Sequence, residues 1–292
     1  MQIGLFGINM GPLSNPENSI KVALTAEEAG FESLWTGEHV VLPEPQSPPS
    51  PLPSDYPMLD PNVSISWLAG QTKTIKFGTG IIILPQRNPL VLAKEMASLD
   101  VLSKGRLLFG VGIGYLKAEF DALGIPFDNK PSRTIEYLEA MHTIWASDLS
   151  GYQGQYVDFS NVAAYPLPTQ KPGPPVHFGG HVRGAYLRTV SHGKGWYGFG
   201  LDVNQARDCI RELKNVAGEM SRPDHLGPIE VSVTPAGNID LERAKKYADL
   251  GVQRLIVLFP TNSGKELFAK NITTNSIIDY VKKLGDEVVG KI

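Results

Sequence analysis

The sequence is poor in cysteine and has no long apolar segment. Its 292 residues include one cysteine, Cys209, which excludes an internal disulfide framework and is typical of a reducing compartment. The longest apolar run, Gly80–Leu84 with its neighbours, is far too short to span a bilayer. A strand-like segment begins at Ile3, so no signal peptide is predicted. We expect a cytoplasmic protein that does not enter a membrane.

An excess of positive charge is also missing. The formal net charge is −3, which excludes the broad positive field that attracts nucleic acids. His177 and His181 are four residues apart, but glycines separate them at a predicted strand-to-helix turn, so no helix presents both to a metal ion. We therefore expect an enzyme that acts on a small molecule and uses no metal.

Short β-branched or apolar runs alternate with longer segments of helical period. This is the pattern of repeated βα units, in which helices cover a parallel sheet. Eight strands are predicted, at Ile3–Asn9, Ser33–Thr36, Lys76–Ile83, Arg106–Gly112, Val176–Gly179, Gly195–Phe199, Ile229–Thr234 and Arg254–Phe259. Helices are predicted at Ser19–Ala29, Pro89–Leu102, Arg133–Trp145, Val182–Ser191, Asn204–Glu219, Leu241–Asp249 and Ile277–Val289. Eight right-handed units favour an α/β fold of one domain, a (β/α)8 TIM barrel over residues 1–292; a doubly wound open sheet is the alternative.

Two segments interrupt the alternation. Val40–Pro61, after the second strand, holds eight prolines in 22 residues and cannot form a regular helix or strand. It is either a solvated insertion or a loop that shapes the substrate entrance, because it follows the C-terminal end of a barrel strand. Ser150–Pro175, before the fifth strand, contains an alternating stretch at Tyr152–Tyr156 that predicts a short hairpin.

Residues at the C-terminal ends of the strands are the functional candidates, because the active sites of barrels form there. Glu38-His39 ends the second strand, and a histidine there titrates near neutrality and can exchange a proton with a substrate. The alternative is a histidine that satisfies backbone groups beneath the adjacent loop. Other residues at strand ends are Asn9, Gly114, Tyr115, Phe199 and Gly200.

Gly179-Gly180-His181-Val182 follows the fifth strand. Its two glycines allow the backbone to approach a ligand closely, and the predicted helix after it offers unpaired N–H groups and a positive dipole end to an anionic phosphate. The alternative is a plain βα turn that requires glycine.

Gly78-Thr79-Gly80-Ile81 lies in the third strand. Glycine within a β-branched strand marks a bulge or a close backbone approach, and a flat ring can lie against such a bulge. The alternative is a glycine that serves barrel packing.

Taken together, these residues resemble the luciferase-like family, which includes F420-dependent reductases and dehydrogenases and FMN-dependent monooxygenases. The resemblance covers most of the chain, in the same order. It rests on the segments Ala26–His39, Phe77–Pro85, Asn88-Pro89 with the following helix, Leu102–Gly114 and His177–Gly180.

The resemblance implies a role for each segment. It implies that Glu38-His39 is the family's acidic–histidine pair and that His39 lies near the cofactor ring, where it transfers protons or orients the substrate. It implies a non-prolyl cis peptide at Gly80-Ile81 that backs the ring in F420 enzymes. The phosphate-binding turn of the family falls on Gly179–Val182.

Two positions depart from the relatives that oxidise a sugar phosphate with F420. Those relatives carry a glutamate after the glycines of the fourth strand, where this chain has Tyr115, with Glu119 one helical turn later. They also have aspartate where this chain has Glu38. Sugar-phosphate oxidation is therefore not expected, and Tyr115 is expected to stack on the ring or to line the pocket.

The resemblance thus implies an F420-dependent oxidoreductase that transfers hydride between the deazaflavin and a small organic substrate. An FMN-dependent monooxygenase fed by a separate flavin reductase, and a barrel that binds a cofactor without catalysis, are the alternatives. Relatives are commonly dimers, so a homodimer is expected. The implied catalytic residues are His39 and Glu38, and the implied cofactor contacts are Asn9, Thr79, Gly80, Ile81, Gly114, Tyr115, Gly179, Gly180, His181, Val182, Phe199 and Gly200.

Overall fold

Parallel strands form a closed barrel in the computed structural model, which describes residues 1–259 and 272–292. The barrel strands in these residues are β1 (Gln2–Phe6), β2 (Ser33–Thr36), β3 (Lys76–Thr79), β4 (Ile82–Ile83), β5 (Leu107–Gly112), β8 (Val176–Gly179), β9 (Gly195–Leu201), β10 (Glu230–Pro235) and β11 (Arg254–Val257). Their order is β3-β2-β1-β11-β10-β9-β8-β5-β4, and β3 also pairs with β5, which closes the sheet. The predicted eight-stranded TIM barrel is confirmed, with its third strand divided into β3 and β4.

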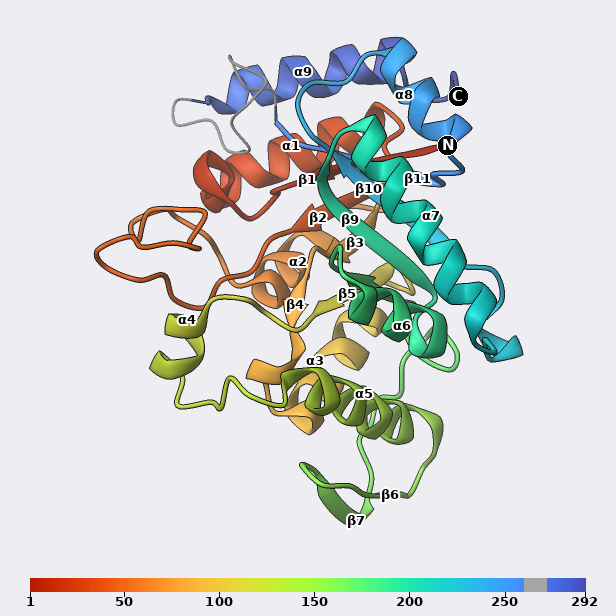
Figure 1. Cartoon of the computed structure of the whole chain (residues 1–292). Helices are drawn as coiled ribbons and strands as arrows, with labels where there is room; N and C mark the ends of the chain where they lie inside the picture. Colours follow the sequence, from red (N-terminus) through yellow and green to blue (C-terminus); the bar gives the residue numbers. More distant parts are fainter. Residues whose placement is uncertain (260–271) are drawn as a thin grey trace.

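Helices surround the barrel (Figure 1). They are α1 (Pro16–Glu28), α2 (Pro61–Ala69), α3 (Pro89–Leu102), α4 (Lys117–Ala122), α5 (Lys130–Ala146), α6 (Arg183–His192), α7 (Val203–Glu219), α8 (Leu241–Asp249) and α9 (Thr274–Glu287), with short 3-10 helices η1 (Gly11–Ser14), η2 (Leu84–Gln86) and η3 (Asp224–Leu226). Every predicted helix is confirmed, with its ends within three residues of those predicted. The sequence reasoning missed α2 and α4.

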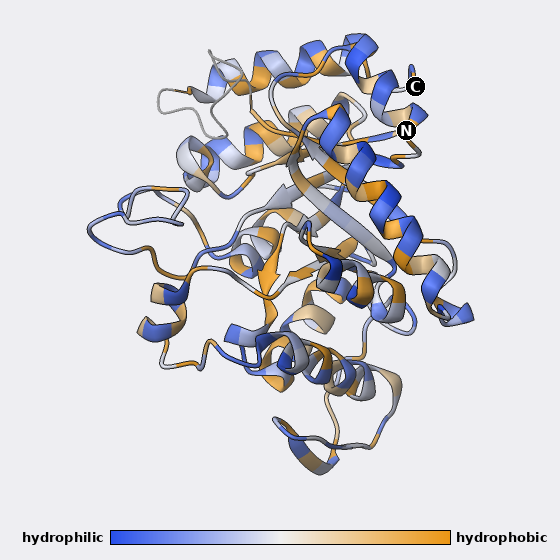
Figure 2. Cartoon of the chain, in the orientation of Figure 1, coloured by the Kyte–Doolittle hydropathy of each residue, from blue (hydrophilic) through white to orange (hydrophobic). Residues whose placement is uncertain are grey.

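An apolar core lies between the strands and the helices. In α7 the buried residues recur every three or four positions, as expected for one helical face against a sheet, and they are Ala206, Ile210, Leu213 and Val216. The opposite face of α7 is hydrophilic (Figure 2). None of the described helices has the length and apolarity that crossing a membrane requires.

A second apolar cluster fills the barrel itself. Its strand residues include Phe6, Trp35, Leu108, Tyr197 and Ile256. The proline-rich segment after β2 contributes Leu42, Leu52, Tyr56 and Met58 to the same cluster. The segment is therefore packed onto the barrel rather than extended into solvent. The predicted hairpin is also confirmed, as β6 (Ser150–Gln153) paired antiparallel with β7 (Asp158–Val162).

The two ends of the barrel face opposite sides of Figure 1. The segment after β2 and helix α4, which both follow C-terminal strand ends, lie at the left, whereas both chain termini lie at the right. A cavity of about 790 Å³ opens at the N-terminal end, where its lining includes the first residues of several strands, Gln2, Lys76, Leu107, Glu230 and Arg254. The predicted site lies at the other end.

Candidate active site

His39, at the C-terminal end of β2, has a polar partner on each ring nitrogen. Its Nδ1 lies 3.2 Å from Oε2 of Glu119 in α4, and its Nε2 lies 3.3 Å from the hydroxyl of Tyr115 in the loop between β5 and α4. The rings of His39 and Tyr115 meet edge to face, with their centroids 5.8 Å apart. A histidine, a phenol and a carboxylate thus form a connected row.

Glu119 is the residue of this row that the sequence reasoning did not place in the site. Its side chain is buried, and its Oε1 accepts a 2.6 Å hydrogen bond from the backbone N–H of Val40. Among the described residues, no lysine or arginine pairs with this carboxylate. The sequence shows Glu119 four residues after Tyr115, but it holds no signal that pairs Glu119 with His39, 80 residues earlier in the chain.

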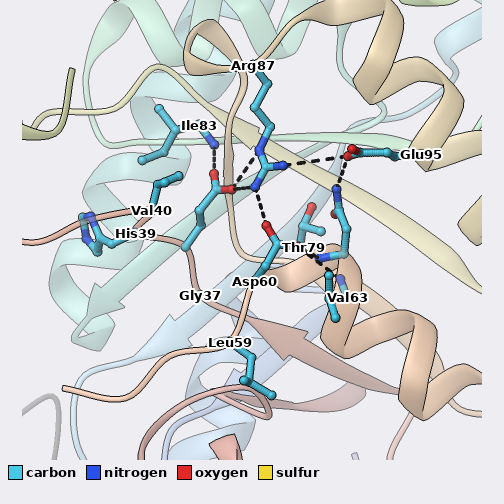
Figure 3. Close-up of polar contacts among 12 residues, drawn as sticks. Gly37, His39, Val40, Leu59, Asp60, Val63, Thr79, Ile83, Arg87 and Glu95 are labelled. Carbon is cyan, nitrogen blue, oxygen red and sulfur yellow. Dashed lines mark hydrogen bonds and ion pairs between the residues drawn. The ribbon is translucent and has the colours of Figure 1, made fainter. Parts of the chain in front are cut away.

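Glu38 faces away from His39. It accepts hydrogen bonds from the backbone N–H of Ile83 and from the guanidinium of Arg87, whose Nε lies 3.0 Å from Oε1. Burial raises the pKa of the Glu38 carboxyl, while Arg87 and the Ile83 amide act against that rise. Figure 3 shows His39 apart from the contacts of Arg87. The structure therefore gives Glu38 the geometry of a residue that fixes the backbone carrying His39.

Arg87 connects Glu38 to two other elements. Its Nη2 lies 2.8 Å from Oδ2 of Asp60, and its Nη1 lies 3.8 Å from Oε2 of Glu95 in α3 (Figure 3). Asp60 is also the N-cap of α2, where its Oδ1 accepts from the amides of the first turn. The ion-pair network holds the ends of β2 and β4 and the start of α2 in one arrangement.

Asn9 and Thr79 use their polar atoms within the fold. The amide of Asn9 donates to the carbonyls of Gly37, at 2.9 Å, and Leu59, at 2.6 Å, and its Oδ1 accepts from the Gly37 N–H at 3.0 Å. The hydroxyl of Thr79 donates to the carbonyl of Gly110 at 2.7 Å. Both residues stabilise the strand ends, and the structure shows no unpaired donor on either side chain.

The peptide bond between Gly80 and Ile81 is cis, which confirms the expectation drawn from the resemblance. A Cβ on Gly80 would lie 3.0 Å from the carbonyl oxygen of Thr36, so glycine suits this close approach. The side chain of Ile81 lies over glycines of the next two strands. A Cβ on Gly112 would come within 2.4 Å of it, and a Cβ on Gly179 within 3.0 Å.

The turn after β8 has a backbone that favours glycine and a helix end without a side-chain cap. Gly180 has φ +125°, and its carbonyl accepts a 2.8 Å hydrogen bond from Nε1 of Trp196. Val182, the N-cap residue of α6, is exposed and makes no capping hydrogen bond. Side chains cap α1, α2, α3, α7, α8 and α9, whereas α4 and α5, like α6, begin without one. An anionic group fits the uncapped end, because the first N–H groups of a helix and its dipole favour negative charge.

His181, in the same turn, is tied to the next strand. Its Nε2 accepts a 3.0 Å hydrogen bond from the backbone N–H of Phe199. Burial lowers the pKa of this imidazole, which agrees with a neutral ring whose Nε2 accepts a hydrogen bond. The ring of Phe199 packs on Phe6 with centroids 5.0 Å apart, and Gly200 follows with φ +69°.

The remaining predicted residue, Gly114, also has positive φ, at +71°. A Cβ there would lie 2.7 Å from Cγ2 of Ile83, so glycine lets the chain turn from β5 toward Tyr115.

Contacts therefore link the predicted segments to one another across the C-terminal end of the barrel. Among the described residues, no group of three or more His, Cys, Asp or Glu side chains is arranged to hold a metal ion.

Comparisons with known proteins find similarity along most of the chain. The sequence model of the family described as luciferase-like monooxygenase matches residues 5–285. An uncharacterised protein of Mycobacterium tuberculosis, Rv0953c, is 28% identical over 258 residues, which are 85% of this chain and 89% of the relative. Among solved structures, the monooxygenase RslO1 from Streptomyces bottropensis has a TM-score of 0.76 at 18% identity and 99% coverage of both chains. An F420-dependent secondary alcohol dehydrogenase has a TM-score of 0.76 at 16% identity and 97% coverage of both. The structural likenesses show the shared fold.

Proposed function

The chain belongs to the luciferase-like monooxygenase family, and from this premise we propose that it is an F420-dependent oxidoreductase acting on a small organic substrate. One observation carries the proposal: the contacts of His39, the Gly80-Ile81 peptide and the uncapped turn before α6 all lie at the C-terminal end of one barrel. The similarity to an F420-dependent alcohol dehydrogenase supports it.

The turn at Gly179–Val182 binds the anionic tail of the cofactor in this proposal. Backbone N–H groups at the start of α6 supply the hydrogen bonds, and the absence of a capping side chain leaves them available. The glycine at position 180 lets the backbone adopt positive φ and approach the ligand closely.

Gly80 and Ile81 form the surface that orients the flat ring, and His39 lies on the adjacent strand end as the group that handles protons. When bound, the deazaflavin supplies or accepts hydride. Glu38 acts indirectly, because its ion pair with Arg87 fixes the backbone from which His39 projects. The protein's contribution is to position the substrate and to exchange its proton at a defined atom.

The segment after β2 limits the access of water. Leu52 is buried in the cluster that fills the barrel, and the backbone of Met58 pairs with that of Met10 at the end of β1. An apolar cover on the interior of the barrel strengthens the electrostatic interactions beneath it.

An FMN-dependent monooxygenase is the second candidate. The likeness to the monooxygenase RslO1 has the same TM-score as the likeness to the F420 enzyme. A phosphate group at the start of α6 suits FMN equally well. Oxygen-dependent turnover with reduced FMN, and none with reduced F420, would favour this candidate.

The test is a titration of the purified protein with F420 and with FMN, followed by fluorescence quenching. We expect saturable F420 binding that weakens at least about tenfold in Gly180→Ala, because alanine strains a backbone at φ +125°. Gly218→Ala, in α7 with open space around its Cβ position, is the matched control and should bind as the wild type does. Absence of binding by either cofactor to the folded protein would refute the proposal.

A further inference from the structure

The hydrogen bonds that join Tyr115, His39 and Glu119 have a defined donor and acceptor at each step. We propose that Glu119 holds the proton of His39 on Nδ1, so that Nε2 accepts from Tyr115 and the Tyr115 hydroxyl exchanges the proton with the substrate. The exchange with substrate rests on the proposed function, whereas the tautomer of His39 does not. In this assignment Tyr115 is the catalytic residue, and His39 and Glu119 position and complete its proton transfer.

The tautomer follows from the contacts of Glu119. An ionised carboxylate accepts hydrogen bonds and donates none. One of its oxygens takes the Val40 N–H at 2.6 Å, and the other lies 3.2 Å from Nδ1 of His39. Nδ1 must therefore carry a hydrogen, which leaves Nε2 of the neutral ring as the acceptor.

Exposure decides which member of the row meets the substrate. The Tyr115 residue is 51% exposed, whereas the side chains of His39 and Glu119 are 9% and 0% exposed. The Tyr115 hydroxyl lies 3.3 Å from Nε2 of His39. A substrate that approaches from solvent reaches the phenol first.

The proton path balances in both directions. During oxidation of an alcohol, the substrate O–H bond breaks and its proton passes to the Tyr115 oxygen. The original phenol proton passes to Nε2 of His39, and a deazaflavin bound at this end of the barrel would accept the hydride that leaves the substrate carbon. The imidazolium formed faces the Glu119 carboxylate, which stabilises the charge. Reduction reverses each step.

The phenol of Tyr115 is a weak acid. Partial burial of the hydroxyl and the neighbouring charge of Glu119 raise the pKa of the phenol, so it remains protonated at neutral pH. It can then lose its own proton only as it receives another, which couples the two transfers.

Glu119→Gln separates this role from a structural one. The Val40 N–H still needs an acceptor, so the glutamine carbonyl oxygen must face it. The amide NH2 then faces His39, and Nδ1 has to become the acceptor. The hydrogen bond to Val40 survives, but the tautomer of His39 reverses.

The experiment is a long-range ¹H–¹⁵N correlation spectrum of the full chain without cofactor, labelled at its six histidines. His39→Gln assigns the resonances. We expect His39 to carry its hydrogen on Nδ1 in the wild type and on Nε2 in Glu119→Gln. The same tautomer in both proteins would overturn the role of Glu119. Since no cofactor is present, this result is independent of the proposed function.

Tyr115→Phe tests the final transfer. With substrates that the wild type converts in the presence of F420, we expect hydride transfer to slow at least about 100-fold in the variant. The affinity for F420 and the tautomer of His39 should stay unchanged. Tyr165→Phe, at an exposed tyrosine outside the row, should turn over as the wild type does. A wild-type rate in Tyr115→Phe would overturn the relay, whereas loss of F420 binding by the wild type would count against the proposed function instead.

Discussion

Two histidines that are largely withdrawn from solvent mark a contrast within the barrel. His39, at the C-terminal end, has a partner within 3.3 Å of each ring nitrogen. His177, in β8, is fully buried, and neither of its nitrogens has a hydrogen-bond partner among the described residues. Burial, together with the nearby charge of Arg254, lowers the pKa of His177 to about 3. Burial keeps His177 neutral, since among the described residues its ring has no hydrogen bond and its one ion-pair contact, the Glu230 carboxylate, lies 3.8 Å from Nε2. The two partners of His39, by contrast, are the groups that our proposal uses for proton transfer.

The carboxylates near the two histidines also differ, in whether an arginine pairs with them. Near His177, Arg254 pairs with Glu32 at 2.8 Å and, although burial acts in the opposite direction, lowers the pKa of Glu32 to about 2. Near His39, the Glu119 carboxylate has no such cation among the described residues. Arginine thus pairs with a largely buried carboxylate at both ends of the barrel, as Arg254 with Glu32 and Arg87 with Glu38, whereas the Glu119 carboxylate hydrogen-bonds only to the His39 ring and the Val40 amide among the described residues.

The largest expected effect is on turnover, when His39 loses its imidazole. Replacing His39 with alanine should slow turnover by about 10²- to 10⁴-fold, because the proton acceptor of the row is removed. The affinity for F420 should change little, since the anion-binding turn is intact. Single-turnover kinetics and a fluorescence titration measure the two quantities. His192→Ala, at a half-buried histidine on α6, is the control, and an unaltered rate in His39→Ala would remove this residue from the mechanism.

The next effect concerns His177 and pH. Its folded pKa lies near 3 and that of an unfolded histidine near about 6.5, so the unfolded chain binds more protons between these values. The free energy of unfolding therefore falls as pH drops through this window, by about 2 kcal/mol between pH 7 and pH 5 from this residue.

His177→Gln tests this contribution, because glutamine is polar but does not titrate. Urea denaturation at pH 7 and at pH 5 should show that the drop in unfolding free energy is about 2 kcal/mol smaller in the variant. Equal drops in both proteins would mean that His177 is not held neutral by burial.

The smallest effect concerns the uncapped N-terminus of α6. Val182→Asp should raise the free energy of unfolding of the cofactor-free protein by about 1 kcal/mol, because aspartate caps the N–H groups of α6. The same change should weaken F420 binding, since a carboxylate then occupies the proposed anion site. Val182→Asn caps without charge and should weaken binding less. Equal affinity in all three proteins would place the cofactor tail elsewhere.

The sequence predicted the strands and the longer helices. Eight barrel strands, the hairpin before the fifth and the helices with long apolar periods are confirmed, because these features depend on local periodicity. Helix α2 was missed because Asp60-Pro61, a strong N-cap and first-turn pair, was included in the proline-rich loop. Helix α4 spans six residues, too few for a periodic signal.

The candidate site was predicted in part for the same reason. His39, Gly80-Ile81 and Gly180 stand at strand ends, where position alone marks a residue as a candidate. Glu119 meets His39 across 80 residues of sequence, and Arg87 meets Glu38 across 49. Such contacts depend on how helices dock on the barrel, which no local pattern records.

The most direct test of the account is a crystal structure of the protein with F420 bound. We predict that the phosphate accepts hydrogen bonds from the backbone N–H groups around Gly180 and Val182, and that the ring lies against Ile81 on the side of His39 and Tyr115. A cofactor found in the 790 Å³ cavity at the N-terminal end of the barrel, or with its phosphate away from α6, would contradict it.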